Sequence, residues 1–170
     1  MTLMPSVILW QMTGEDLTIL FKVIIAVCMG GIIGIERELS RKPAGIRTHM
    51  FVAGAAALIL SISTLLIEEF SMSAGQVSSD PVRVIEAIVV GISFIGAGTV
   101  LKSSSSRHVY YLTTAASILF AAAIGITVGL EKYGLAGAIT VLVVLINAAV
   151  GSLEQKYLRK KPDRTDDVSP

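Results

Sequence analysis

The sequence predicts an all-α membrane protein, a polytopic bundle of five transmembrane helices, and three observations lead to this prediction. Of the 170 residues, 53% are hydrophobic and only 16% are charged, whereas soluble domains carry about 25% charged residues. The mean hydropathy is +0.73. The apolar residues gather in five runs, each long enough to cross a hydrocarbon core of about 30 Å as a helix. Lone strands would leave backbone polar groups unsatisfied in lipid.

The five predicted helices follow one another with short polar connections. We place them at Leu17–Ile35, Met50–Ile67, Val84–Leu101, Leu112–Leu130 and Gly134–Leu153. Residues 1–16 form an expected external segment, residues 17–153 the transmembrane domain, and residues 154–170 a cytoplasmic, partly disordered tail. The first run is too long for a signal-peptide core and no Lys or Arg precedes it, so we expect it to remain in the mature protein.

The first helix ends in a cluster of charges within the stretch GGIIGIERELSRKPAGIRTHM, residues 30–50. Pro43 and Gly45 break the chain into a turn before the second helix. Glu36, Arg37 and Arg47 abut the hydrocarbon, where charges are usually paired. Two interpretations stay open: an ion-paired network that closes the inner ends of the first two helices, or a cytoplasmic ion site.

The Lys and Arg residues predict the orientation of the bundle. The first and third connections and the tail hold eleven of these cations, whereas the second and fourth connections hold only Arg83 and Lys132. The positive-inside rule therefore places the eleven-cation side in the cytoplasm. We expect the N terminus outside and the C terminus inside.

Small residues recur at every fourth position in three of the predicted helices. These residues are Ala26, Gly30 and Gly34 in the first helix, Ala53, Ala57 and Ser61 in the second, and Ala121, Gly125 and Gly129 in the fourth. Such stripes let helix backbones approach closely in lipid. We interpret them as packing faces, within one protomer or between two.

The third helix begins with a predicted N-cap at Asp80 and with Pro81 at its first position. Its glycines, Gly91, Gly96 and Gly98, favour either a break that exposes carbonyl groups, as in some carriers, or tight packing.

Two ionisable residues fall inside the predicted spans, and both lie near the outer boundary. Lys22 and Glu86 either form an ion pair that closes the outer side or reach the interface independently. No Asp, Glu or His falls at mid-depth, so a conventional carboxylate-lined cation path is not expected. The candidate metal ligands are Asp80 and Glu86 outside and Glu36 inside. We interpret His49 and His108 as interface residues and not as ligands.

Catalytic and nucleic-acid functions find no support in the sequence. It contains no glycine-flanked nucleophilic serine, no HExxH motif and no phosphate-cradling loop. The clustered cations are explained by topology, so no nucleic-acid partner is expected. We predict that the protein is not an enzyme and has no resident cofactor, with Mg²⁺ as a ligand or substrate at most.

Four motifs resemble the membrane domain of the MgtC/SapB family. GGIIGIERE, AGIRTHMFVAGAAAL, DPVRV with GISFIGAG, and LTTAASILFAAAIGITVG match in order and spacing from about Gly30 to Gly129. The resemblance implies a multi-pass protein of the bacterial cytoplasmic membrane, associated with magnesium homeostasis and, in some members, with virulence. It implies either carriage of Mg²⁺ or regulation of other membrane machines, including the ATP synthase.

The matching polar positions are Glu36, Arg37, Glu38, Arg47, Thr48, Asp80, Arg83, Thr113 and Thr114. Two departures stand out: Glu86 and Ala87 replace a common Ala-Gln pair, and Ser93 replaces a usual glycine. Because only 17 residues follow Leu153, the chain resembles the short SapB-like form without a soluble C-terminal domain.

Combining residues and resemblance, we expect one inner polar cluster formed by Glu36, Arg37, Glu38, Arg47, Thr48, Thr113 and Thr114. At the outer end, we expect the acidic and ion-pair group Lys22, Asp80, Arg83 and Glu86. Two functions remain open: transport or binding of a divalent cation, and regulation by docking another membrane protein. Lipid handling is a weaker third interpretation. The expected partners are the bilayer, Mg²⁺, a second copy in a homodimer, and a membrane protein.

Overall fold

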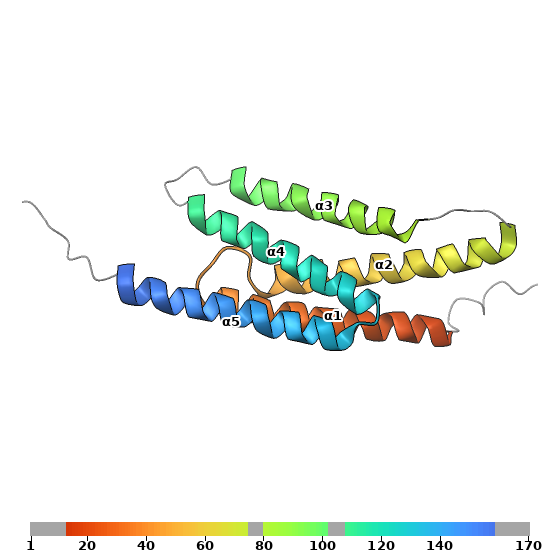
Figure 1. The fold of residues 1–170 in the computed structure, drawn as a ribbon, viewed down its shortest axis with the longest axis horizontal. Coiled ribbons are helices and arrows are strands. Elements are labelled where there is room, and N and C mark those ends of the chain that lie inside the picture. Colours follow the sequence, from red (N-terminus) through yellow and green to blue (C-terminus); the bar gives the residue numbers. More distant parts are fainter. Residues whose placement is uncertain (1–12, 75–79, 102–107, 159–170) are drawn as a thin grey trace, which may run out of the picture.

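Three of the five helices form the centre of the bundle. A computed structural model of the protein describes the backbone of residues 13–74, 80–101 and 108–158, and the side chains of residues 13–69, 80–101 and 111–151. The helices are α1 (Gly14–Leu39), α2 (Ile46–Ala74), α3 (Pro81–Leu101), α4 (His108–Gly129) and α5 (Tyr133–Leu158), as labelled in Figure 1. All five are long and apolar enough to cross a membrane, which confirms the predicted fold class.

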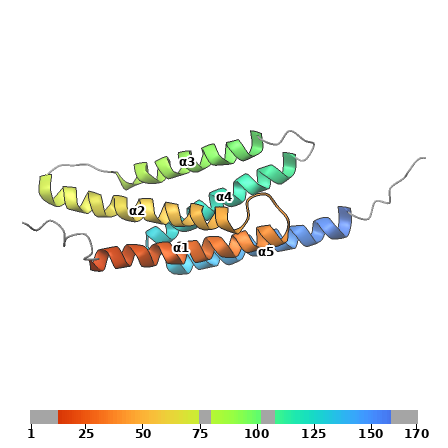
Figure 2. The same cartoon turned by 180° about the vertical axis from the view of Figure 1, so that it is seen from behind.

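The helices at the centre are α1, α2 and α4, and each contacts the other two. α3 packs on α4 and α2, whereas α5 packs on α1 and α4. Figures 1 and 2 show α3 and α5 on opposite sides of the centre. Because α1, α3 and α5 run one way and α2 and α4 the other, the helix ends gather at two places. We call the end where α1, α3 and α5 finish the basic end, and the other the opposite end.

The observed helices extend beyond most of the predicted apolar runs. α1 begins at Gly14 and ends at Leu39, and its first turn carries a capping box between Thr13 and Asp16. Polar residues continue the helices past the apolar runs, because caps and not hydropathy set where a helix ends. The expected external segment, residues 1–16, and the expected tail, residues 154–170, lie largely outside the described residues.

Two of the turns place residues other than glycine in the left-handed region, and Ala44 is one of them, with a φ of 59°. Arg41 after α1 and Glu131 after α4 have φ values of 52° and 63°. At both ends the following amide bonds back to the last helical turn: Lys42 N to the Arg37 carbonyl, and Lys132 N to the Thr127 carbonyl. This is the Schellman pattern, in which glycine usually takes the left-handed position.

The N-terminus of α3 follows the prediction. The Val82 amide donates to Asp80 Oδ1 at 2.9 Å, and Pro81 is the first helical residue. Thus the Asp80 side chain accepts a hydrogen bond at the helix start, where an amide would otherwise lack a partner.

The small-residue stripes bring three backbones into contact. A Cβ placed on Gly30 of α1 would overlap the His49 carbonyl oxygen of α2 and lie 2.8 Å from the Ala53 methyl group. A Cβ on Gly125 of α4 would overlap the Ala53 carbonyl oxygen and lie 2.9 Å from the Ala56 methyl group. Fully buried Ala53 therefore lies where α1 and α4 both meet α2.

The predicted break of α3 is wrong. α3 is one continuous α-helix from Pro81 to Leu101, so its glycines do not interrupt it. Only Gly96 is used in packing, because its Cβ position lies 3.4 Å from the Ala115 methyl group, whereas those of Gly91 and Gly98 have nothing within 4 Å. In a bilayer, a break with exposed carbonyls on this outer helix would face lipid and leave those groups without partners.

Two substitutions by leucine test which glycines lie in close helix–helix contacts. Gly125→Leu forces a side chain into the α2 backbone and is expected to cost about 3 kcal/mol or to prevent folding. Gly98→Leu on α3 meets open space and is expected to leave stability unchanged or raise it by about 1 kcal/mol, since glycine is a poor helix former. Thermal unfolding of both variants in detergent measures the difference. Equal midpoints would contradict the close contact of α2 and α4.

Candidate functional site: a polar cluster at the basic end

A buried chain of hydrogen bonds joins the three central helices at the basic end. Arg37 Nη2 on α1 donates to Thr114 Oγ1 on α4 at 3.4 Å. Ser117 Oγ, also on α4, lies 2.8 Å from the Thr114 carbonyl oxygen. His49 Nε2 on α2 lies 3.1 Å from Ser117 Oγ. All four side chains are buried, with exposed fractions between 0% and 5%.

The His49 ring is held by its own helix as well as by α4. Its Nδ1 lies 2.9 Å from the Gly45 carbonyl oxygen, which only accepts, so Nδ1 carries the hydrogen. In the neutral ring Nε2 is then an acceptor. The Ser117 hydroxyl has one proton and two acceptors within reach, His49 Nε2 and the Thr114 carbonyl. The prediction that His49 is a loop residue at the membrane interface is therefore wrong, because His49 lies within α2 and is fully buried against α4.

Arg37 is a buried cation with few compensating contacts. Its side chain is 4% exposed, its Nε has no hydrogen-bond partner among the described atoms, and the structure describes no ion pair for its guanidinium. Burying a charge without a partner costs several kcal/mol. Arg37 is thus one group in the described structure whose position packing alone does not explain.

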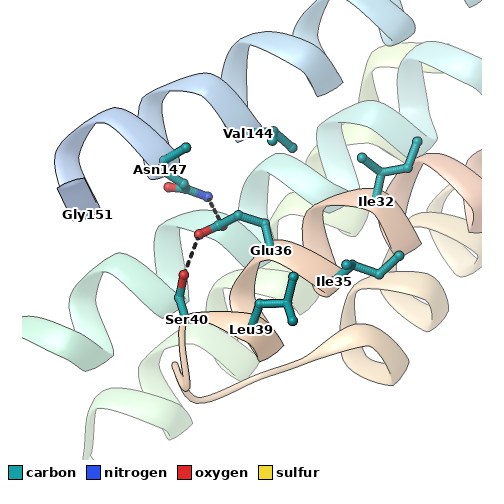
Figure 3. Close-up of a pocket in the computed structure, with 9 residues that line it drawn as sticks. Ile32, Ile35, Glu36, Leu39, Ser40, Val144, Asn147 and Gly151 are labelled. Atoms are coloured by element: carbon teal, nitrogen blue, oxygen red, sulfur yellow. Dashed lines mark hydrogen bonds between the residues drawn. The ribbon is translucent and has the colours of Figure 1, made fainter.

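The two acids that flank Arg37 point elsewhere. Glu38 Oε2 accepts the Ile46 amide at 3.1 Å, so this carboxylate caps the N-terminus of α2 and meets the positive end of its dipole. Glu36 lies on the side of α1 that faces α5 and accepts hydrogen bonds from Ser40 Oγ and Asn147 Nδ2, both at 2.9 Å (Figure 3).

A groove opens beside Glu36 between α1 and α5. Its volume is about 530 Å³, and α1 contributes Ile32, Ile35, Glu36, Leu39 and Ser40 to its walls. α5 contributes Val144, Asn147, Ala148 and Gly151. The Glu36 carboxylate is the single charged group in this lining.

The other expected cluster residues lie at the same end but outside the buried chain. Arg47 and Thr113 are exposed and Thr48 is half-buried. Sequence reasoning did not assign Ser117 or Asn147 to the cluster, and it did not expect His49 to be part of it. His49 and Ser117 each lie four residues before a small-residue stripe, at Ala53 and Ala121, and this spacing was the available signal.

At the opposite end, the predicted pair of Lys22 with Glu86 is wrong. Lys22 Nζ lies 2.8 Å from Glu131 Oε1, in the turn between α4 and α5. Glu86 is on α3, which does not contact α1 in the described structure. Arg83 and Glu86 are both exposed on α3.

The three candidate metal ligands do not meet. Asp80 and Glu86 lie at the start of α3, and Glu36 lies near the end of α1, at the other end of the bundle. Among the residues that the structure describes, no three His, Cys, Asp or Glu side chains are placed to hold one metal ion. Asp80, Glu86 and Glu36 therefore form no common site.

Comparison with known proteins covers nearly the whole helical region. A family model described as "MgtC family" matches residues 23–156, a range that includes every residue of the polar cluster. No solved structure matches.

Three relatives illustrate the similarity. The chain is 36% identical over 128 residues to an Escherichia coli protein named "Putative magnesium transporter YhiD", covering 74% of this chain and 58% of that one. It is 35% identical over 130 residues to the Brucella abortus "Protein MgtC", covering 76% and 50%. It is 33% identical over 140 residues to the Synechococcus elongatus "Protein SrpB", covering 78% and 75%. The chain thus spans between half and three quarters of the length of these relatives.

Substitutions of Arg37 test whether its charge stabilises the fold. Arg37→Met keeps most of the side-chain volume and removes the buried charge, so the unfolding midpoint is expected to stay the same or rise. Arg37→Ala leaves a cavity and is expected to lose about 3 kcal/mol. Arg47→Met, at the exposed position, is the matched control and is expected to be neutral. Thermal unfolding in detergent checks all three, and a loss in Arg37→Met equal to that in Arg37→Ala would show that the charge itself supports the bundle.

The Lys22–Glu131 pair predicts an acid-dependent loss of stability. The hydrogen bond from Lys22 and then its charge hold the pKa of Glu131 below its usual value of 4.5. Because the folded pKa is the lower one, the stabilisation is fully present above 4.5 and is lost as the pH falls through the folded value. The midpoint of the wild type is expected to fall more steeply below this pH than that of Glu131→Gln.

The same pair predicts unequal single substitutions. Glu131→Gln leaves the buried Lys22 ammonium without its partner, whereas Lys22→Met leaves only an exposed carboxylate, 63% accessible. Glu131→Gln is therefore expected to destabilise more than Lys22→Met. Additive effects in the double variant would argue against the pair.

Proposed function

The chain belongs to the MgtC family, and we propose on that basis that it is a multi-pass protein of the bacterial cytoplasmic membrane that serves magnesium homeostasis. We propose further that it acts as a regulator of another membrane protein, without carrying ions through its own bundle. The basic end faces the cytoplasm in this proposal, as the distribution of Lys and Arg predicts.

The close packing of the centre is the observation that carries this proposal. Where α1 and α4 cross α2, at Gly30 and Gly125, the packing leaves no room even for a Cβ atom. Mg²⁺ holds oxygen ligands at about 2.0–2.1 Å and gives up its water slowly. A path between the three central helices would therefore require them to separate by more than the width of a hydrated ion.

The buried hydrogen-bond chain supports a regulatory role at the basic end. Arg37 bonds to Thr114 and His49 lies 3.1 Å from Ser117, so α1 and α2 are each joined to α4, and a displacement of α4 strains both contacts. Burying the Arg37 charge costs free energy of folding, which is consistent with a residue that serves function and not stability.

Binding or transport of Mg²⁺ is the second candidate function. The name of the Escherichia coli relative favours it, and so does the Glu36 carboxylate beside the Asn147 amide and the Ser40 hydroxyl. Their oxygen atoms are the kind of ligand that Mg²⁺ prefers. In this function the groove between α1 and α5, and not the centre of the bundle, would hold the ion.

Reconstitution separates the two candidates. Purified protein in liposomes filled with a Mg²⁺-sensitive dye is expected to admit Mg²⁺ no faster than protein-free liposomes, while an established Mg²⁺ transporter in the same lipid is the positive control. Cells that lack the gene are expected to regain growth in low Mg²⁺ with the wild type and not with Arg37→Met, provided that this variant folds. Flux through the wild type that Glu36→Gln abolishes would overturn the regulatory proposal and support transport.

A further inference from the structure

The outer face of α3 carries two charged residues that have no partner in the described structure. α3 is the least buried of the five helices, and Figures 1 and 2 show it on one side of the bundle. Arg83 and Glu86 are exposed in its first two turns, and the structure describes no ion pair for either. Charged groups within membrane-spanning segments are usually paired. The start of α3 thus presents one cation and one anion to its surroundings.

The same face continues as an apolar surface along the helix. Its residues recur at intervals of seven, four and seven: Arg83, Val90, Phe94 and Leu101. Their side chains are exposed, those of Phe94 and Leu101 by 84% each, whereas Ile88 on the other side of α3 is buried in the bundle. Intervals of this kind place side chains on one line along a helix, the arrangement by which two parallel helices pack against each other.

The two charges make this face complementary to itself. Two copies of a chain in one membrane have the same orientation, so a two-fold axis between them runs along the membrane normal, and equivalent helices at that axis are parallel and lie at equal depth. Arg83 and Glu86 are three residues apart, about 4.5 Å along the helix, so the Arg83 side chain of one copy can reach the partner's Glu86. Symmetry then repeats the contact. The exposed face of α5 offers no such contact, because its described side chains, 133–151, include no charged residue.

We propose that two copies of this chain form a parallel homodimer through the outer face of α3. Each Arg83 forms an ion pair with the partner's Glu86, and Val90, Phe94 and Leu101 pack against the same residues of the other copy. The exposed face of α5 and the groove between α1 and α5 stay open to another membrane protein. The inference does not depend on the proposed regulatory function.

Cysteine crosslinking in the membranes of expressing cells tests which face forms the contact. In a Cys28→Ala background, Val90→Cys on α3 is expected to give a disulfide-linked dimer on oxidation. Leu145→Cys, at an exposed position of α5, is the matched control and is expected to stay monomeric. The proposal is overturned if Val90→Cys gives no dimer, or if Leu145→Cys gives as much.

Charge reversal tests the ion pairs. Arg83→Glu and Glu86→Arg each place like charges at both symmetric contacts and are expected to weaken the dimer roughly tenfold, because two ion pairs are lost at once. A mixture of the two variants restores opposite charges at both contacts, so a heterodimer is expected to form with the affinity of the wild type. Energy transfer between labelled copies in liposomes, measured over a range of protein-to-lipid ratios, gives the dimer fraction.

The mixture distinguishes a specific contact from charges that reach water independently. Independent charges predict the same dimer fraction in every combination, and this result overturns the proposal, as does a mixture that recovers no dimer. Both reversals change exposed side chains and are expected to fold. Glu86→Gln, which removes both ion pairs without adding repulsion, is the milder variant, and a dimer as tight as that of the wild type would also contradict the proposal.

Discussion

The crossing of α1 and α4 over α2 at Ala53 is the contact on which the rest of the bundle depends. In lipid there is no hydrophobic driving force for apolar helices to associate, so their association depends on close packing and on polar contacts between helices. Gly30 and Gly125 provide that closeness, because each lets its backbone touch the backbone of α2. α3 and α5 pack on opposite sides of this centre. Many of their large hydrophobic side chains are exposed, as expected of helices that face lipid.

The same crossing assembles the polar cluster at the basic end. His49 lies one turn from Ala53 on α2, and Ser117 lies two turns from Gly125 on α4, so close approach of the stripes brings the two side chains within 3.1 Å. Arg37 is carried into the same interface by α1 and loses most of its water there. Packing and polar contacts are therefore coupled, because the small residues set the distance between the helices and this distance allows the buried polar groups to contact one another.

The opposite end is fastened differently, by one ion pair between a buried and an exposed group. Lys22 reaches the turn after α4, where Glu131 occupies the left-handed position that glycine usually takes. Glycine there would relieve the backbone but remove the carboxylate that compensates Lys22. The buried Lys22 ammonium thus accounts for a carboxylate at this left-handed position. The ion pair holds α1 against the turn that leads into α5.

The sequence by itself determined the number, order and approximate limits of the helices, the cap at Asp80, and the packing role of the stripes, because these depend on local composition and on spacing along one helix. It also placed Glu36, Arg37 and Thr114 at a common end. Only the tertiary structure decided the partners: Lys22 with Glu131 and not Glu86, Glu36 with Asn147, Arg37 with Thr114, and His49 with Ser117. The physical reason is rotation. Depth along a helix can be counted from sequence, but the neighbour of each side chain depends on which helices touch and on their rotation about their axes. A helix in lipid is apolar on all faces, so no contrast between an apolar and a polar face reveals that rotation.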